Sequence, residues 1–495
     1  MASLSPDQMD RLVDLVVAKM RDGRHSTSLG MNGTQGPRES FARVSEGYSV
    51  RYRAPATLRG AGGGVFDDLD TAVKAAHAAF EQLREQDLTV RAKMIENMRR
   101  THLEHTRELS ELAVQETGLG RVVDKIAKNT TAASKTPGLE ILVTRAFTGD
   151  DGLTLHERAP FGVIGSITPT TNPTETVINN AISMVAAGNT VVFNVHPSAK
   201  KVSRRNIELI NEAIVAAGGP ENCVCMLAEP TIESAQALMK HPGIRVVVVT
   251  GGPAVVKAAM ASGKRAVCAG PGNPPVVVDE TANLDQAARD VVLGASFDNN
   301  IICIVEKELF AVEKIADALK ERMLRSGAVE VSGAALRRLE KLVIVDDHPA
   351  KQWVGKDAAK ILRAAGVSCH DDTRLALCEV DAGHPLVQLE MLMPVFPMVR
   401  VKDVDTAIEE AVKAEHGFFH TAVMHSTNID HLHEMARAVN TSLFVKNAPS
   451  YAGLGVGGEG YTAWTIAGSS GDGLTTALTY TRERRCTLKD KFRIV

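Results

Sequence analysis

The sequence is poor in aromatic residues and has no long apolar run. Phe, Trp and Tyr make up 4% of the 495 residues, which argues against a large aromatic cage as the binding site. No apolar stretch approaches the roughly 18 residues that a bilayer-spanning helix needs, and the first residues lack the pattern of a secretory leader. The net charge is −3, so we expect neither a nucleic-acid nor a membrane partner.

Cysteines are also few, and their spacing fits no metal site. Their number is odd, and we predict no bound metal and a reducing, cytoplasmic location. The seven cysteines are Cys223, Cys225, Cys268, Cys303, Cys369, Cys378 and Cys486.

The N-terminal residues form a distinct unit of the sequence. Apolar residues from Met9 to Met20 recur at helical spacing, and Ser5 and Pro6 supply start signals for a helix. We predict an amphipathic helix over 1–22 and a flexible linker rich in Gly, Ser and Arg over 23–64. The helix either folds back on the main domain or docks on a partner protein.

The rest of the chain has the pattern of an α/β protein. From 163 to 269, short apolar strands alternate with helices, which is typical of βαβ units and a buried parallel sheet. We assign 65–274 to a Rossmann-like nucleotide-binding domain, 275–450 to a second α/β domain, and 451–495 to a return to the first. Helices are predicted before the first sheet at 66–83, 88–118 and 121–135. Strands outside the βαβ region are predicted at 152–160, 309–312, 342–345, 395–401, 474–480 and 487–495.

Three loops leave the carboxyl ends of the predicted strands, where such sheets bind ligands. They are 169–173, 196–198 and 250–253. Gly251 and Gly252 directly precede a helix, where backbone N–H groups and the helix dipole suit a phosphate; turn geometry alone is the alternative explanation. The G-x-G-x-x-G at 455–460 neither follows a strand directly nor opens a helix, so we reject it as a dinucleotide-binding motif.

Cys303 is the candidate nucleophile. It follows Asn299 and Asn300, a pair that favours turns, and a turn at the mouth of an α/β sheet suits a reactive thiol. A packed structural thiol is the common alternative. With a pKa of about 8.5, only a few per cent of the thiol would be thiolate at neutral pH, so it needs local help to react.

Several of these motifs carry a family resemblance. One set of segments resembles the aldehyde dehydrogenase superfamily: 160–165, 172–173, 187–192, 250–252 and 272–274, together with Cys303 and Glu390. A second set further resembles the CoA-acylating propionaldehyde and acetaldehyde dehydrogenases of bacterial microcompartments: 116–121, 196–197, 298–303, 415–417 and 465–468. The resemblance covers roughly residues 65–495 and implies the aldehyde dehydrogenase fold, with 275–450 as the catalytic domain.

The resemblance implies a chemistry and a set of site residues. Cys303 would attack a short-chain aldehyde, and the side-chain amide of Asn172 with the backbone N–H of Cys303 would hold the oxyanion. Hydride transfer to NAD would leave a thioester, which CoA would take up. Glu390 would bind the nicotinamide ribose. The other residues implied in cofactor binding are Thr168, Pro169, Thr170, His196, Pro197, Thr250, Gly251, Gly252 and Gly270.

Two departures from relatives are informative. Hydrolytic relatives carry a water-activating glutamate where this sequence has Cys268, and without a general base water attacks a thioester poorly. A thiol needs less help, so the substitution favours CoA as the acyl acceptor. NAD-preferring relatives place a glutamate after Lys-Pro-Ser, whereas His196-Pro197-Ser198 is followed by Ala199, which leaves some use of NADP open. For His196 itself, a structural role and a ligand contact are both open.

The resemblance also implies context. The helix at 1–22 would be an encapsulation peptide that binds shell or core proteins of a microcompartment. The strands at 152–160 and near the C-terminus would form an oligomerisation sheet in a homodimer or homotetramer. The alternatives are a hydrolytic aldehyde dehydrogenase, which would need a carboxylate near Cys303 from another loop, and a non-catalytic scaffold on the same fold.

Overall fold

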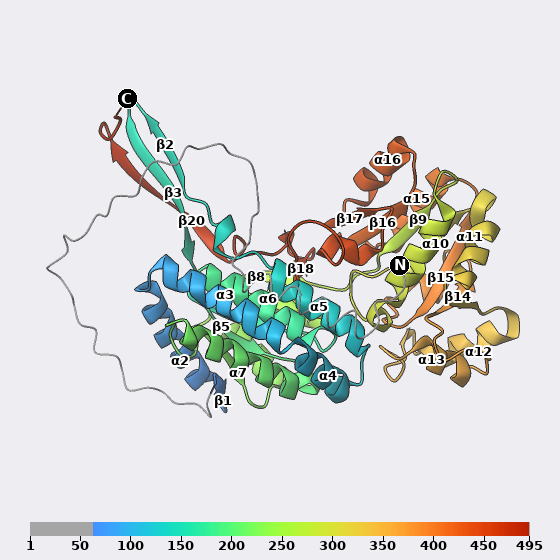
Figure 1. Ribbon diagram of the computed structural model, residues 1–495, viewed down its shortest axis with the longest axis horizontal. Coiled ribbons are helices and arrows are strands. Elements are labelled where there is room, and N and C mark those ends of the chain that lie inside the picture. The colour runs from blue at the N-terminus through green and yellow to red at the C-terminus, as the bar shows by residue number, and fades with distance from the viewer. Residues whose placement is uncertain (1–62, 495) are drawn as a thin grey trace. The chain divides into compact units, whose positions relative to one another are not determined.

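The computed structural model describes residues 63–494. The predicted helix at 1–22 and nearly all of the linker at 23–64 lie outside these residues. Two parallel sheets and one antiparallel sheet organise the described part, as Figure 1 shows. Within residues 63–494, no helix is long and apolar enough to cross a membrane.

The first parallel sheet has the strand order β1-β6-β5-β4-β7-β8. Its strands are almost wholly apolar and alternate between two cores, which explains why both faces must be covered by helices. On β5, Val191 and Phe193 pack with one core, and Val192 packs with the other. The strands are β1 (Val65–Phe66), β4 (Val163–Ile167), β5 (Thr190–Asn194), β6 (Val224–Leu227), β7 (Val246–Thr250) and β8 (Arg265–Ala269).

Two sets of helices cover this sheet. One core contains residues of α3 (Leu88–Glu104), α6 (Pro173–Ala186) and α7 (Lys200–Ala216), and the other contains residues of α8 (Ile232–Lys240) and α9 (Pro253–Met260). Helix α2 (Leu69–Arg84) contributes to both. Further helices beside the first set are α4 (Thr106–Thr117), α5 (Val122–Lys135) and the short η1 (Leu139–Ile141) and η2 (Pro197–Ala199).

The chain reverses direction across this sheet at β4. It runs from β4 through β5 to β6 on one side, and then crosses to β7 and β8 on the other. Strands β4 and β7 are parallel neighbours, so the loops that follow them leave the same edge of the sheet. A reversal of this kind opens a crevice at the carboxyl ends of the strands, where doubly wound folds bind ligands.

The second parallel sheet has the order β11-β14-β15-β10-β9-β16-β17. Most of its residues are apolar, and it packs against helices. Its strands are β9 (Pro275–Val278), β10 (Glu308–Val312), β11 (Ala328–Glu330), β14 (Leu375–Glu379), β15 (Val395–Val401), β16 (Thr421–His425) and β17 (Leu443–Lys446). Its helices are α10 (Leu284–Ser296), η3 (Phe297–Asn300), α11 (Glu313–Arg325), α12 (Gly333–Val343), α13 (Ala358–Ala364), α14 (Pro385–Gln388), α15 (Val404–Ala414), α16 (Ile429–Val439) and η4 (Ser450–Leu454).

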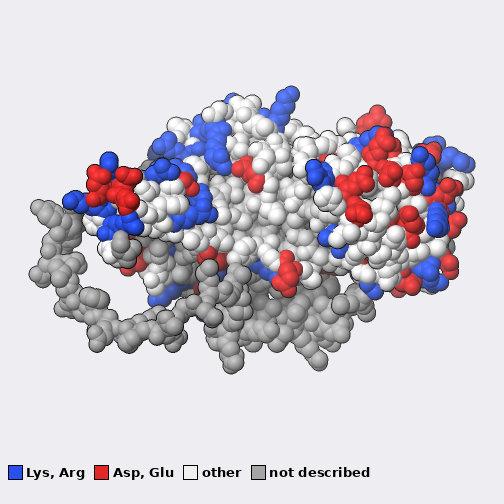
Figure 2. Space-filling view, turned by 90° about the horizontal axis from the view of Figure 1, so that it is seen from above, with Lys and Arg blue, Asp and Glu red and all other residues white. Residues whose placement is uncertain are grey.

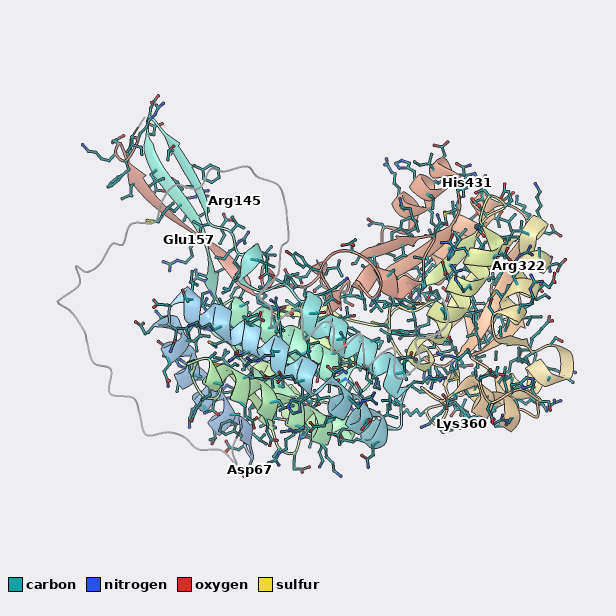
Figure 3. All side chains as sticks on the ribbon, in the orientation of Figure 1. Asp67, Arg145, Glu157, Arg322, Lys360 and His431 are labelled. Atoms are coloured by element: carbon teal, nitrogen blue, oxygen red, sulfur yellow. The ribbon has the colours of Figure 1, made fainter. Side chains whose placement is uncertain are left out.

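The antiparallel sheet joins distant parts of the sequence. β3 (Gly152–Pro160) lies between β2 (Arg145–Gly149) and the C-terminal β20 (Thr481–Lys489). Most of β20 is exposed, and Figure 3 marks Arg145 and Glu157 on this sheet. Its role in oligomerisation stays a prediction. Two short hairpins complete the strands: β12 (Ile344–Val345) with β13 (His348–Pro349), and β18 (Ile466–Ala467) with β19 (Gly473–Leu474).

Four predicted elements were wrong in part. The helix predicted at 88–118 is two helices, because His105 leaves helical geometry (φ −104°, ψ 8°) while the apolar spacing continues. The strand predicted at 342–345 is also only partly present. Its first two residues are the end of helix α12 (Gly333–Val343), on which Val343 is buried. A short apolar run in a sequence occurs in both strands and buried helices, so it does not show which of the two forms.

The third error concerns 474–480, most of which is turn. The backbone N–H groups of Thr479 and Tyr480 donate to the carbonyls of Thr476 and Ala477, three residues earlier, so these residues form turns and do not pair as a strand. The last strand begins and ends earlier than the predicted 487–495. The segment 455–460 opens no helix, in agreement with its rejection as a dinucleotide-binding motif.

Charges of the two signs are interspersed on the described surface. On the face in Figure 2, Lys and Arg lie beside Asp and Glu, as expected for a chain with a net charge near zero.

We predict that Gly120→Ala destabilises the protein more than Gly263→Ala does. Both glycines have φ +75°, where alanine is strained by roughly 1–2 kcal/mol. At Gly120, an added Cβ would also lie 2.0 Å from Oδ1 of Asp298, whereas nothing lies within 4 Å at Gly263. Thermal unfolding midpoints measure the difference, and equal midpoints would contradict the close packing at Gly120.

Candidate active site

The turn before Cys303 has an unusual backbone. Asp298, Asn299 and Asn300 all have positive φ (48°, 53° and 64°), a left-handed conformation that Asn and Asp tolerate better than other side chains. All three are buried. The turn expected from the Asn pair is therefore present, and it positions the half-buried Cys303 three residues later.

Lys307 holds this turn from inside. Its ammonium donates to the carbonyl (2.8 Å) and the side-chain oxygen (2.7 Å) of Asn300, and to the carbonyl of Ile302 (3.1 Å). A buried ammonium needs such partners to offset its lost hydration. Burial lowers the pKa of Lys307 to about 8, against the charge of Glu390, which raises it.

Cys303 is surrounded by charges of both signs. Burial and the charge of Glu390 raise the pKa of the thiol to about 12, while Lys307 and Lys128 oppose this rise. Glu390 is held by the backbone N–H of Gly272, which donates to Oε1 at 3.3 Å. A Cβ at Gly272 would lie 2.8 Å from the carbonyl oxygen of Cys303, so this position requires glycine.

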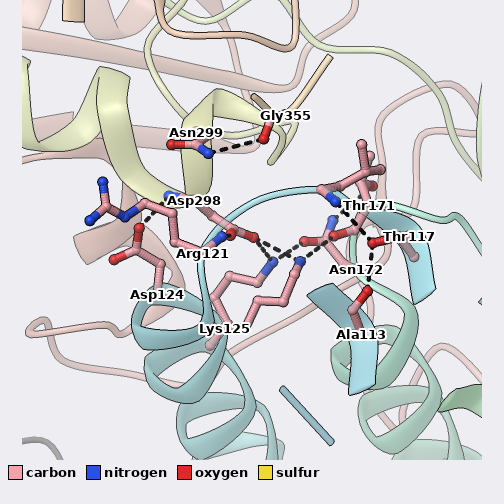
Figure 4. A network of polar contacts seen from close by, with 12 residues as sticks. Ala113, Thr117, Arg121, Asp124, Lys125, Thr171, Asn172, Asp298, Asn299 and Gly355 are labelled. Atoms are coloured by element: carbon pink, nitrogen blue, oxygen red, sulfur yellow. Dashed lines mark hydrogen bonds and ion pairs between the residues drawn. The ribbon is translucent and has the colours of Figure 1, made fainter. Parts of the chain in front are cut away.

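Asn172 is fixed at the start of α6. It is the residue before Pro173, the first residue of the helix, and its side chain is almost fully buried. Its Oδ1 accepts a hydrogen bond from the Lys128 ammonium at 2.7 Å, and its Nδ2 lies 3.2 Å from Oγ1 of Thr171. Figure 4 shows Asn172 within a larger network of polar contacts that also contains Asp298.

His420 is a residue of the site that sequence reasoning missed. A Cβ at Gly272 would lie 3.0 Å from its ring, so the imidazole and Cys303 both border Gly272. Nδ1 lies 2.9 Å from Oγ1 of Thr421, and the buried Nε2 has no hydrogen-bond partner in the described part of the chain. Burial and the charge of Lys307 lower the pKa of His420 to about 4, so the ring is neutral at pH 7.

Cys268 is fully buried near the end of β8. Burial, with the charge of Asp472, raises the pKa of its thiol to about 11. Its backbone N–H donates to Oγ of Ser470 at 2.9 Å. The side chain belongs to an apolar core, so it can neither activate water nor serve as a second nucleophile.

The loops beyond β4 and β7 have features that suit a nucleotide. The hydroxyls of Thr168 and Thr170, on either side of Pro169, are buried and have no hydrogen-bond partner within residues 63–494. The N–H of Gly251 donates to the Ala269 carbonyl of β8 at 3.0 Å, whereas a Cβ at Gly252 would meet nothing within 4 Å. Hydroxyls without partners, and a backbone segment at a helix start that no side chain covers, are features that suit the binding of a pyrophosphate.

Other predicted cofactor residues have partners within the protein. The Thr250 hydroxyl bonds Oγ1 of Thr465 at 2.9 Å. A Cβ at Gly270 would lie 2.6 Å from Oγ of Ser469. Nδ1 of His196 accepts from the N–H of Ser198 at 3.2 Å and so caps the short helix that Pro197 begins. These contacts give His196 a structural role through Nδ1.

Known proteins resemble this chain over most of its length. The pattern of the aldehyde dehydrogenase family matches residues 62–335. Acetaldehyde dehydrogenase (acetylating) EutE of Salmonella typhimurium is 53% identical over 439 residues, which cover 87% of this chain and 94% of that protein.

Two solved structures share the fold at high identity. Rhodopseudomonas palustris propionaldehyde dehydrogenase, with bound CoA and an acylated cysteine, matches with a TM-score of 0.85 and 48% identity over 87% of this chain and 99% of that one. A propionaldehyde dehydrogenase from the Clostridium phytofermentans fucose utilisation bacterial microcompartment matches with a TM-score of 0.86 and 46% identity over 87% and 100%. With the thiol, the amide and the two parallel sheets arranged as described, these matches show that the chain belongs to the aldehyde dehydrogenase family.

Proposed function

We propose that this protein oxidises a short-chain aldehyde, propionaldehyde or acetaldehyde, to its acyl-CoA with a nicotinamide cofactor. The observation that carries the proposal is the convergence on Cys303 of Gly272, Glu390 and two buried lysines, on a turn that positions the thiol. The acetylating EutE relative and the CoA-bound, acylated relative support the same reaction.

The chemistry assigned to the chain has two halves. The Cys303 sulfur, in its thiolate form, attacks the aldehyde carbon. The electron pair of the carbonyl double bond moves to the oxygen, which becomes an oxyanion held by Nδ2 of Asn172 and the backbone N–H of Cys303. Loss of a hydride from the same carbon leaves a thioester on Cys303. The CoA thiolate then attacks the thioester, which forms the acyl-CoA and returns the Cys303 thiolate.

The nicotinamide cofactor would be held by the loops beyond β4 and β7. Thr168 and Thr170 offer unpaired hydroxyls, and Gly252 offers open backbone at the start of α9. When bound, the nicotinamide accepts the hydride. Glu390 lies close enough to Cys303 to shift its pKa, and we assign it to the nicotinamide ribose.

The hydrolytic alternative would use a carboxylate beside Cys303, and Glu390 is such a carboxylate. Two observations favour CoA instead. Position 268 holds a buried thiol in place of a water-activating carboxylate, and the relatives include an acetylating acetaldehyde dehydrogenase and a CoA-propanoylating propanal dehydrogenase of Salmonella typhimurium. Thioesters react readily with thiolates and slowly with water that no base activates.

The cellular setting is part of the proposal. A relative from a fucose utilisation microcompartment supports a location inside such an organelle, with residues 1–22 as the peptide that binds shell or core proteins. The exposed β20, paired with β3, supports a homodimer or homotetramer built on this sheet.

We expect NADH formation from NAD and propionaldehyde to be sustained only with CoA, and the product to be propionyl-CoA by mass spectrometry. Cys303→Ala should abolish turnover because the thioester cannot form. Cys369→Ala is the matched control, since Cys369 is another half-buried thiol, whose Sγ lies 3.7 Å from the Ala359 carbonyl. Equal turnover without CoA, yielding the free acid, would support the hydrolytic alternative, and an active Cys303→Ala would exclude this mechanism.

Asn172→Ala should lower kcat by about 10²–10³, the usual effect of losing one oxyanion donor. The KM for NAD should stay nearly unchanged, because the amide acts on the reacting carbonyl. Steady-state kinetics with a thermal unfolding scan separate this effect from lost folding. A folded variant with an unchanged kcat would remove Asn172 from the site.

Deletion of residues 1–22 should leave kcat and KM unchanged and abolish encapsulation. The physical reason is that a short peptide can bind a partner protein without contributing to the core of the enzyme. Activity of the purified deletion variant, and its recovery with isolated microcompartments, test both parts. A loss of activity would place the helix in the core of the enzyme.

A further inference from the structure

We propose that Lys128 is a positioning residue that orients the Asn172 amide for the oxyanion and ties it to the turn that carries Cys303. This inference rests on the proposed function, because it assumes that Asn172 is an oxyanion donor. Lys128 lies on α5 and belongs to none of the motifs that the sequence singled out.

The Lys128 ammonium sits at the centre of a buried polar cluster. Its side chain has no solvent exposure. It lies 2.7 Å from Oδ1 of Asn172, 2.6 Å from Oδ2 of Asp298 and 3.1 Å from Oε1 of Glu175. Burial opposes its charge, but Asp298 and Glu175 outweigh this and raise the pKa of Lys128, so the group remains an ammonium.

An ammonium fixes which way a neighbouring amide points. Lys128 has only donors, so the atom of Asn172 that faces it must be the oxygen. The amide nitrogen is then turned away from Lys128, where Thr171 Oγ1 is its one partner among the described residues. An amide whose oxygen binds a cation also becomes a stronger donor through its nitrogen, because hydrogen bonds in a chain polarise one another.

The same ammonium binds the residue that shapes the Cys303 turn. Oδ1 of Asp298 accepts from the backbone N–H of Arg121 at 2.7 Å, and Oδ2 binds Lys125 at 3.1 Å as well as Lys128. The backbone N–H of Asp298 donates to Oδ2 of Asp124 at 2.9 Å. Figure 4 shows these contacts joining α5 to the turn.

Lys128 therefore links the two donors expected to hold the oxyanion. One is the side-chain amide of Asn172, which it contacts directly. The other is the backbone N–H of Cys303, whose turn begins with the left-handed Asp298. A shift of one donor relative to the other would weaken the stabilisation, which depends on both being aimed at the same oxygen.

Lys125 provides a matched control. It lies one helical turn from Lys128, is equally buried, and binds the same Asp298 oxygen. Its other bond goes to the carbonyl of Thr171 at 3.2 Å and not to Asn172. Loss of Lys125 thus removes one buried charge from Asp298 but leaves the Lys128 contact to the Asn172 amide.

The experiment is a double-mutant cycle with Lys128→Met and Asn172→Ala, repeated with Lys125→Met. We expect Lys128→Met to lower kcat by about 10- to 100-fold, up to the loss of one oxyanion donor, with the KM for NAD unchanged. In the Asn172→Ala background the same substitution should cost less than about threefold, because its target is already gone. Lys125→Met should lower kcat less and act additively with Asn172→Ala.

The outcomes separate this inference from the proposed function. An unchanged kcat in folded Lys128→Met, or an equal loss with and without Asn172, would overturn the role of Lys128. A normal kcat in Asn172→Ala would instead refute the proposed oxyanion donor. If Lys128→Met does not fold, the double variant Lys128→Met/Glu175→Gln takes its place in the cycle. This double variant removes a buried negative charge together with the positive one. Its kcat is compared with that of Glu175→Gln alone.

Discussion

The active site depends on one buried carboxylate. Asp298 has no solvent exposure and sits between two ammonium groups, those of Lys125 and Lys128. Its backbone is left-handed, as are the next two residues, which costs free energy at each of these positions. The ion pairs and backbone hydrogen bonds on Asp298 offset that cost, and so they fix the turn that presents Cys303.

Buried charges of this kind are tolerated only in complete networks. Each ammonium of the pair has an oxygen partner besides Asp298, and Oδ1 of Asp298 accepts a backbone N–H. Removing one member leaves an uncompensated charge among fully buried side chains, which costs more than the interaction itself contributes. This explains how helix α5, which carries no reacting group, becomes part of the site.

The site is assembled from segments far apart in the sequence. Asn172 starts a helix of the first sheet, Gly272 lies between the two sheets, and Cys303 and Glu390 belong to the second α/β region. Their contacts place a carboxylate and a thiol together, yet the buried thiol at position 268 leaves water without its usual base. In the proposed mechanism, the choice of acyl acceptor therefore depends on Cys268 as well as on Cys303.

Much of the fold could be predicted from the sequence because its signals are local. Alternation of apolar strands and helices identified the βαβ region, and Asn299 and Asn300 marked a turn because their side chains tolerate left-handed backbone. Where the local signal is ambiguous, prediction was wrong: the apolar spacing runs on across His105, and the apolar run at 342–345 is split between a helix and a short strand.

The sequence by itself determined the α/β class, the turn before Cys303 and the absence of a carboxylate at position 268. Only the tertiary structure decided the environment of these residues. Lys125, Lys128 and Lys307 read as ordinary charged positions, since lysine is normally exposed. The burial of Lys125 and Lys128 depends on oxygen partners distant in the sequence, and that of Lys307 on the oxygens that the folded turn directs toward it. Likewise, the neutral His420 beside Gly272 depends on burial from several elements, which no local pattern records.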